Sequence, residues 1–284
     1  MEFKQKFVGF VDILGWKEKV RRAETGTGMS LTELLEAAKD LGTPADKGRI
    51  EKYGPMICPR SNYILRNLDF QLTRISDCVV VSSEISPVGV INLVNHCWGA
   101  VIKLLTKGIM CRGYITRGQI YHTDNEIIGT GYQEALDKEH NVSAFKREAD
   151  ERGTPFVEID PSVCDYVKEC GDACVKEMFS RYVNHDGSMT ALFPFQRLQH
   201  SFIVGDCLGH TFDPDKERRS NENMRSMIQQ TKERVIAALD QSRPDAVGKA
   251  QHYVAALDAQ LEVCKKLDKE IEMLRDAFRK RTGK

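Results

Sequence analysis

Residues 7–17 read Phe-Val-Gly-Phe-Val-Asp-Ile-Leu-Gly-Trp-Lys, and this stretch decides the fold of the chain. The run is apolar almost throughout up to Val11, which predicts a buried strand, and it reaches a carboxylate at Asp12. The residues from Ile13 to Lys17 then turn into a helix. In folds of this kind, ligands gather where a strand ends and a helix begins, because free N–H groups and the helix dipole attract phosphate. Asp12 is therefore a candidate functional residue.

A second carboxylate, Asp77, lies at the connection between two further predicted strands, 68–75 and 77–83. A lone Asp in such a place is more often a turn former or a helix cap. Two acids from neighbouring strands could instead hold two divalent cations about 3.5–4 Å apart, the usual arrangement for phosphoryl chemistry. Mg²⁺ and Mn²⁺ prefer oxygen ligands, so two carboxylates suit them.

The rest of the pattern predicts an α+β domain with antiparallel strand pairs and flanking helices. Ser30 and Glu33 form a capping-box pattern at the start of one helix. The glycines of 109–122 indicate a bend or a close approach of the backbone. The expected elements are a helix over 29–42, a loop over 43–60, a helix over 87–107, a strand over 109–122, a helix over 131–150, a strand over 156–160 and a helix over 162–170.

We expect a core over residues 1–165 and an extension over 166–284, which is mainly a helical hairpin from about residue 220. Pro244 is expected to separate two antiparallel helices. Apolar residues in the second helix step by three or four and form one stripe, which could pack on a domain or form a dimeric coiled coil. The stripe consists of Leu257, Leu261, Cys264, Leu267, Ile271, Leu274 and Phe278.

Composition excludes some classes of function. The 284 residues carry 41 Lys plus Arg and 41 Asp plus Glu, and this balance argues against a dedicated nucleic-acid binder. We expect no membrane span and no signal peptide, and so a cytoplasmic protein. The nine cysteines are expected to be free thiols. Cys164, Cys170 and Cys174 are spaced as on a helix face, unlike the paired knuckles of zinc sites.

Four segments resemble class III nucleotide cyclases. Residues 10–16 resemble the first metal-binding motif of that family, roughly F-x-D-I-x-G-F, and residues 74–78 resemble the second, I-G-D. Residues 112–118 look like the central strand of the family, and residues 129–139 like the helix that follows it. Each segment alone is a weak signal. Together they follow the order of the family over about residues 7–160.

The resemblance implies a class III cyclase-like sheet with a ferredoxin-like core and flanking helices, followed here by a C-terminal helical extension. It implies two Mn²⁺ (or Mg²⁺) ions per site, held by Asp12, Asp77 and the carbonyl of Ile13. The N–H groups of Ile13, Leu14, Gly15 and Trp16 would bind phosphate. The family also forms homodimers with shared active sites, so that the acids would come from one subunit and the helix over 130–138 from the other.

Departures from the family pattern bear on the substrate. Thr73 and Thr130 stand where purine cyclases carry the Lys and Asp that read the base, which points away from ATP and GTP. Gln133 replaces the family Asn and could still bond to ribose. Asp137 replaces the family Arg, so another cation must stabilise the developing charge. The candidates are Lys138, Arg117, Arg112 and Arg147.

This combination resembles the bacterial pyrimidine cyclases of anti-phage signalling, which make cyclic UMP or cyclic CMP. UTP is favoured over CTP as the substrate, and no nucleic acid or membrane is expected as a partner. The base would be read by residues from Thr73, Arg74, Thr130 and Tyr132. One alternative is a degenerate cyclase fold that senses a ligand without turnover, and another is an interaction module that acts through the helical tail.

Overall fold

The computed structural model describes residues 1–64, 67–148, 150, 153–193, 213–239 and 243–282. Contacts divide the chain into two compact units, Met1–Pro194 and Phe195–Lys284. The boundary expected at residue 165 falls inside helix α6 (Pro161–Glu169), and strands of the same sheet follow it. Each unit is described by itself.

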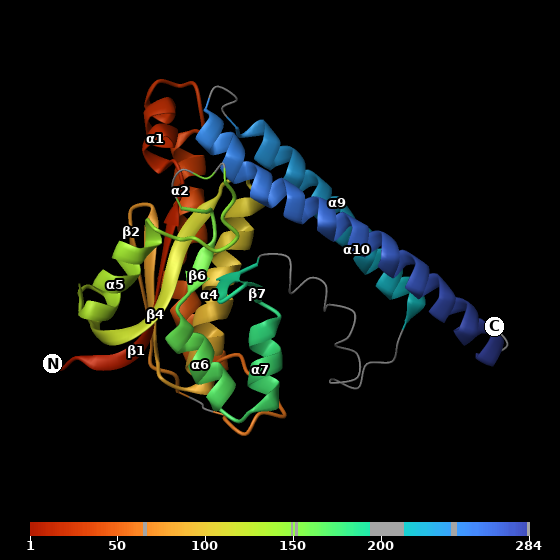
Figure 1. Ribbon diagram of the computed structural model, residues 1–284, viewed down its shortest axis with the longest axis horizontal. Helices are drawn as coiled ribbons and strands as arrows, with labels where there is room; N and C mark the ends of the chain where they lie inside the picture. Colours follow the sequence, from red (N-terminus) through yellow and green to blue (C-terminus); the bar gives the residue numbers. More distant parts are fainter. Residues whose placement is uncertain (65–66, 149, 151–152, 194–212, 240–242, 283–284) are drawn as a thin grey trace. The chain divides into compact units, whose positions relative to one another are not determined.

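One sheet forms the framework of the first unit (Figure 1). Its strands lie in the order β2-β3-β1-β4-β6-β8-β7, and β5 pairs with β4 outside this path. The strands are β1 (Lys4–Ile13), β2 (Phe70–Ile75), β3 (Cys78–Glu84), β4 (Cys111–His122), β5 (Ile127–Ile128), β6 (Val157–Ile159), β7 (Val183–Asp186) and β8 (Met189–Leu192). The first four pair antiparallel, with helices between β1 and β2 and between β3 and β4. This βαββαβ arrangement confirms the expected α+β fold with a ferredoxin-like core.

The helices of the first unit differ from expectation at two places. They are α1 (Trp16–Glu24), α2 (Leu31–Asp40), α3 (Pro44–Tyr53), α4 (Pro87–Leu105), α5 (Thr130–Glu139), α6 and α7 (Ala173–Ser180). Helix α3 occupies the expected loop, because Thr43 and Asp46 form a capping box around Pro44 at the first turn. Helix α5 ends at Glu139 rather than near 150, since the carboxylate of Glu158 accepts the N–H groups of Ser143 and Ala144.

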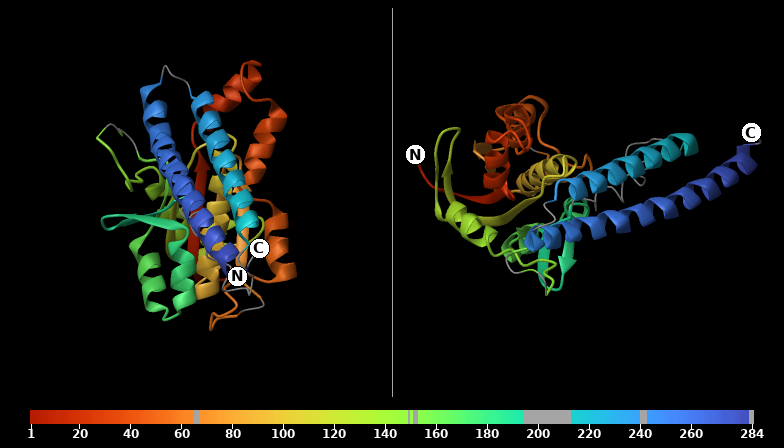
Figure 2. Two further views of the ribbon diagram at one scale, coloured as in Figure 1. Left: turned by 90° about the vertical axis from the view of Figure 1, so that its right-hand side faces the viewer. Right: turned by 90° about the horizontal axis from the view of Figure 1, so that it is seen from above.

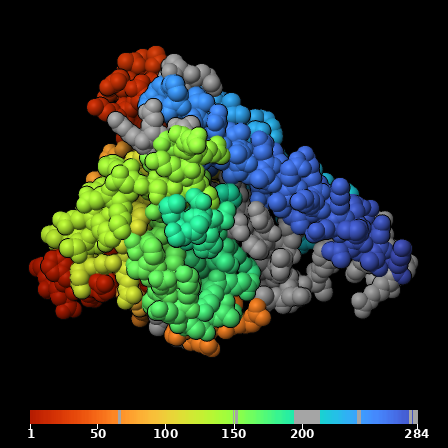
Figure 3. Space-filling model, viewed as in Figure 1, coloured from red at the N-terminus to blue at the C-terminus, as the bar shows by residue number. Residues whose placement is uncertain are grey.

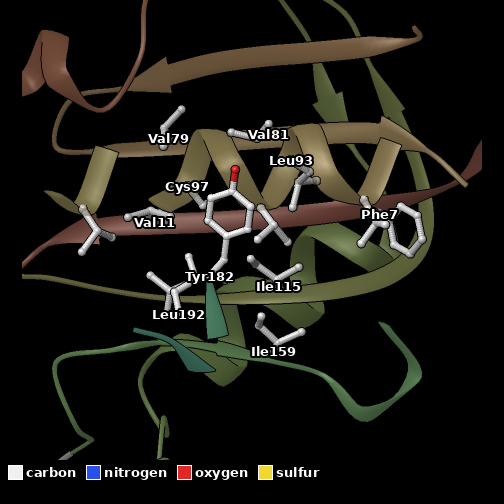
Figure 4. Packing of buried hydrophobic residues seen from close by; sticks show 14 of the residues in the cluster. Phe7, Val11, Val79, Val81, Leu93, Cys97, Ile115, Ile159, Tyr182 and Leu192 are labelled. Atoms are coloured by element: carbon white, nitrogen blue, oxygen red, sulfur yellow. The ribbon is translucent and has the colours of Figure 1, made fainter. Parts of the chain in front are cut away.

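Helix α4 covers one face of the sheet and forms the main core. Side chains from β1, β3, β4 and β6 pack around Leu93 and Cys97 of α4 (Figure 4). By length and composition α4 could cross a membrane, with a mean hydropathy of 1.4, but 67% of that window is buried within the protein. Its contacts with β1 and β3 identify it as the core helix of the sheet.

Helix α5 lies on the other side of the sheet from α4 (Figure 1). The approach is close where Gly118 of β4 meets Gly131 of α5: a Cβ added at Gly118 would lie 2.6 Å from the Cα of Gly131. The expected close approach of the backbone in the 109–122 segment is therefore confirmed at Gly118. A small cluster that includes Val8, Phe10 and Ala135 fills this interface.

The second unit contains the hairpin of α9 (Pro214–Ala237) and α10 (Pro244–Thr282), which run side by side in both views of Figure 2. Asn221 bonds to Asp268, while Lys232 pairs with Asp258, so the two helices are antiparallel. Of the predicted stripe, Leu257, Cys264 and Ile271 are buried, whereas Leu274 is 51% exposed. The side chain of Phe278 lies outside the described part of the chain.

Candidate active site

The carboxylates Asp12 and Asp77 lie at the same end of neighbouring strands. Asp12 is the penultimate residue of β1 and is paired in register with Cys78 of β3. Asp77 occupies the two-residue turn between β2 and β3, and its carbonyl accepts the N–H of Ile13 at 3.0 Å. Both acids are half-buried. The hairpin thus fixes the second acid beside the end of β1, as an acid pair requires.

The carboxylate of Asp12 lies in a partly buried setting with other acids nearby. Burial raises the pKa of Asp12 to about 7, and the nearby Asp77 and Glu139 add to this effect, while Arg112 opposes it. The thiol of Cys78 lies among the same charges, and burial together with Asp12, Asp77 and Glu139 raises its pKa to about 12. Each of these shifts means that the surroundings disfavour further negative charge. A divalent cation placed here would relieve that repulsion.

An ion pair between Arg112 and Glu139 lies next to Asp12, on the β4 side. Arg112 of β4 lies opposite Asp12 in the strand register, and its Nε donates to the Glu139 carboxylate at 2.5 Å. Glu139 is fully buried, and its other oxygen lies 2.5 Å from Nδ1 of His140. Among the residues that the structure describes, Arg112 is therefore the cation that faces the acid pair most directly. Its guanidinium is also bonded to Glu139.

Only some of the backbone N–H groups in the β1–α1 turn are free to bind a ligand. The N–H groups of Ile13 and Leu14 donate to the carbonyls of Asp77 and Met110. This corrects the expectation that these two N–H groups bind phosphate, because they hold the β2–β3 hairpin and the start of β4 against β1. The N–H groups of Gly15 and Trp16 stand at the start of α1, where helices leave their first amides without intrahelical partners.

Helix α5 directs a polar stripe away from its own sheet. Gly131 and Ala135 are buried and Tyr132 packs on Phe10 with ring centroids 6.4 Å apart. Thr130 and Gln133 are exposed on the remaining part of the helix, as are Asp137 and His140. These residues step by three or four, so they share one face. The segment around α5 belongs to the surface seen in Figure 3.

Two of the proposed catalytic cations do not meet the acid pair within the chain. Arg117 pairs with Phe7, whose side chain packs in the α4 core, so Arg117 lies on the face opposite Asp12. There its guanidinium lies 5.8 Å from the ring centroid of Tyr166. Lys138 is tied to Asp160 at 3.0 Å and also reaches Glu134. Within one chain, both cations are therefore engaged away from the acid pair.

The candidate base-reading residues are divided between bonded and exposed positions. The hydroxyl of Thr73 lies 3.1 Å from Nε2 of the buried His122, whose Nδ1 bonds to Ser82. Burial lowers the pKa of His122 to about 4, so this histidine is neutral and structural. Arg74 and Thr130 are exposed, while Tyr132 is half-buried.

Sequence reasoning missed two charged residues of the site. Glu139 approaches Asp12 only because α5 folds back onto β4, so no local pattern marks it. Lys19 of α1 is half-buried near Cys111 at the start of β4. Burial, together with Arg22, lowers the pKa of Lys19. Lys19 could have been found from the sequence, because it lies one turn into a helix that begins at the site.

No known family profile and no curated protein matches this sequence. Nine chains of solved structures match. One is the catalytic core of a rhodopsin-guanylyl cyclase with converted specificity in complex with ATPαS, at 13% identity and a TM-score of 0.37. The match covers 60% of this chain and 83% of that one.

Proposed function

We propose that the chain is a metal-dependent nucleotide cyclase that converts a pyrimidine nucleoside triphosphate, UTP rather than CTP, to the 3′,5′-cyclic monophosphate and diphosphate. The observation that carries this proposal is the acid pair at a strand end beside a helix N-terminus, where burial and then the charge of Asp77 raise the pKa of Asp12. Two repelling carboxylates do not stabilise a fold by themselves. They become favourable when cations bind between them.

The donor set fits Mn²⁺ or Mg²⁺. Among the described residues no cluster of three or more His, Cys, Asp or Glu side chains could hold a metal. Mg²⁺ sites in phosphoryl-transfer enzymes commonly use one or two carboxylates, with substrate phosphates and water completing the shell. Two ions would be held by Asp12, Asp77 and the carbonyl of Ile13, and would supply charge neutralisation for the triphosphate and the ribose 3′-oxygen.

In the reaction, the ribose 3′-oxygen attacks the α-phosphorus in line and its proton passes to solvent. The new P–O bond closes the ring, and the bond from the α-phosphorus to the bridging oxygen breaks, so that diphosphate leaves. The N–H groups at Gly15 and Trp16, with the dipole of α1, would bind phosphate oxygens. Most of the rate enhancement would come from positioning and electrostatics.

Pyrimidine specificity is supported by the polar groups around the site. Thr73 and Thr130 carry neither of the charged groups that read a purine, and Thr73 is already bonded to His122. The exposed Arg74 and Thr130 and the half-buried Tyr132 remain as readers of the uracil edge. The resemblance to anti-phage pyrimidine cyclases also suggests a cytoplasmic protein whose cyclic product signals infection.

We place the complete site in a homodimer. The exposed stripe of Thr130, Gln133 and Asp137 points away from the sheet that carries Asp12 in the same chain. In a two-fold dimer, this stripe would meet the nucleotide bound by the partner. Mixing Asp77→Asn chains with Gln133→Ala chains should restore activity, because one of the two shared sites in a mixed dimer is intact. Lack of restoration in mixed dimers of known composition would contradict a shared site.

The direct test is incubation of the purified chain with each of the four nucleoside triphosphates and Mn²⁺, with products identified by mass spectrometry. We expect one cyclic pyrimidine monophosphate, reduced about 10²–10³-fold by Asp77→Asn. Asp124→Asn is the matched control, because Asp124 is an exposed acid in the turn between β4 and β5 that pairs with Lys47. Equal product from both variants, or a cyclic purine nucleotide, would overturn the corresponding part of the proposal.

The pairing of the cations favours a second candidate, a fold that binds metal and nucleotide without turnover. Arg112 is engaged by Glu139 and Lys138 by Asp160, while Arg117 lies on the other face. Saturable binding of UTP with Mn²⁺, without cyclic product in a folded dimer, would select this candidate over the enzyme.

A further inference from the structure

Two cysteines that are more than a hundred residues apart in sequence meet on the first unit. Cys58 follows α3 in the segment that leads to β2, and Cys174 is the second residue of α7. Each thiol shifts the pKa of the other, so the two side chains are neighbours, and both residues are half-buried. The eight cysteines within the described part of the chain are all reduced. This contact was not apparent from the sequence, in which Cys174 seemed to belong with Cys164 and Cys170.

A buried carboxylate holds the two cysteine-bearing segments together. Asp172, only 3% exposed, accepts the hydroxyl of Ser61 at 2.7 Å and the N–H of Asn62 at 3.0 Å. Its other oxygen accepts the N–H of Cys174 at 2.8 Å and that of Val175 at 3.1 Å. The N–H of Ser61 donates to the carbonyl of Cys58 and closes the turn between these two residues. The two segments that carry Cys58 and Cys174 are therefore held side by side.

The surroundings give the two thiols different characters. Burial raises the pKa of Cys58, but hydrogen bonds from Arg60 and Cys174 and the charge of Arg60 outweigh it and leave the pKa below its usual value. The hydrogen bond to Cys58 raises the pKa of Cys174. The fully buried Cys97 has no nearby positive charge among the causes of its shift, and burial raises its pKa to about 12. Thiolate character combined with access distinguishes reactive from inert cysteines.

We infer that Cys58 and Cys174 are a peroxide-reactive thiol pair, in which Cys58 is oxidised first and Cys174 resolves it to a disulfide. The Cys58 thiolate attacks hydrogen peroxide, the O–O bond breaks, and sulfenic acid and hydroxide form. The Cys174 thiol then loses its proton and attacks the Cys58 sulfur. The S–S bond forms, the S–O bond breaks, and the oxygen leaves as water. In sum, two thiols and one peroxide give one disulfide and two waters.

The test is peptide mapping of the full-length, reduced chain after brief exposure to a small excess of hydrogen peroxide. Remaining thiols are alkylated, and the chain is digested without reductant. We expect a cross-linked peptide pair joining Cys58 to Cys174, lighter by two hydrogens than the separate peptides. In Cys174→Ser, Cys58 should accumulate as a sulfenic acid that dimedone traps. In Cys58→Ser, no cross-link to Cys174 should form.

Cys170→Ser is the matched control, because Cys170 is also half-buried and near α7 but its thiol donates to the carbonyl of Val167. This variant should cross-link at the wild-type rate. The oxidised wild type should also unfold about 5–10 °C higher, since the bond closes a long loop of the unfolded chain. Unchanged alkylation of Cys58 after peroxide, or a dominant link from Cys58 to Cys170, would overturn the inference. Neither readout depends on nucleotide chemistry.

Discussion

The two faces of the sheet in the first unit are built from the same strands but serve different purposes. On the α4 face, alternate residues of β1 such as Phe7 and Val11 are sealed in an apolar core. On the α5 face, the intervening residues lead from Val8 and Phe10 to the carboxylate of Asp12. Period-two alternation separates the two sets along one strand. The first face stabilises the fold, and the second carries charges that oppose folding and are suited to binding ions.

The largest expected effect is on the charged face. Arg112→Met leaves the fully buried Glu139 without its cation, and we expect a loss of about 3–5 kcal/mol in unfolding free energy. The double variant Arg112→Met/Glu139→Leu should recover most of that loss, because no unpaired charge remains. Urea denaturation of the three proteins measures both steps. A double variant as unstable as Arg112→Met would show that the pair is not what stabilises this region.

A cavity on the α4 face should lower the unfolding free energy by somewhat less than the loss of Arg112. Leu93 is fully buried against β1, and we expect Leu93→Ala to lower the unfolding free energy by about 3 kcal/mol. The control is Leu136→Ala on the α5 face, where the side chain is only partly buried and the cost should be about half as large. The comparison of the two faces fails if the two denaturation midpoints shift equally.

The pH dependence of the stability of the metal-free protein should reveal the unfavourable environment of the ionised Asp12. The folded pKa of Asp12 is about 7 against an ordinary 3.8, so the folded state binds its proton more tightly. The contribution of Asp12 to stability is therefore greatest below about pH 4, falls as the pH rises through 4 to 7, and stays reduced above that. At pH 8 in a chelator, Asp12→Asn should be more stable than wild type by about 1–3 kcal/mol.

The difference between Asp12→Asn and wild type should vanish at pH 4, and Mn²⁺ should reduce it at pH 8. Thermal unfolding at the two pH values, with and without the ion, measures this. A constant difference across the pH range would show that Asp12 is not held in a destabilising environment.

The smallest effect concerns the turn that carries Asp77. Ser76 has a φ of 55°, a conformation that favours glycine, which the cyclase motif has at this position. Ser76→Gly should raise the unfolding free energy by about 1 kcal/mol and leave Mn²⁺ binding intact. Phe145→Gly is the contrast, because Phe145 also has a positive φ but packs against Phe156. Glycine there should destabilise the protein through lost packing.

Local signals predicted much of the fold. The apolar run of β1, the Ser30–Glu33 capping box and the start of α10 at Pro244 all lie where their residues indicated. Helix α3 was missed because Gly, Pro and charge obscured the Thr43–Asp46 cap. The end of α5 could not be predicted, because it depends on Glu158, which comes from a strand later in the chain.

Long-range contacts decide the site, and they are the part that the sequence could not show. Asp12 and Asp77 were found because each follows a recognisable strand. Glu139 reaches Asp12 only through the folding of α5 onto β4. Arg117 was proposed as catalytic although register places it with Phe7 on the core face, a distinction that needs the β1–β4 pairing.

Mn²⁺ binding, followed by electron paramagnetic resonance on the full chain, tests most directly the claim that the acid pair is an ion site. The wild type should bind Mn²⁺, and both Asp12→Asn and Asp77→Asn should weaken binding at least tenfold, while Asp124→Asn should bind as wild type. Equal Mn²⁺ affinity in all four folded proteins would contradict the account, because the two carboxylates would then have no role in holding a cation.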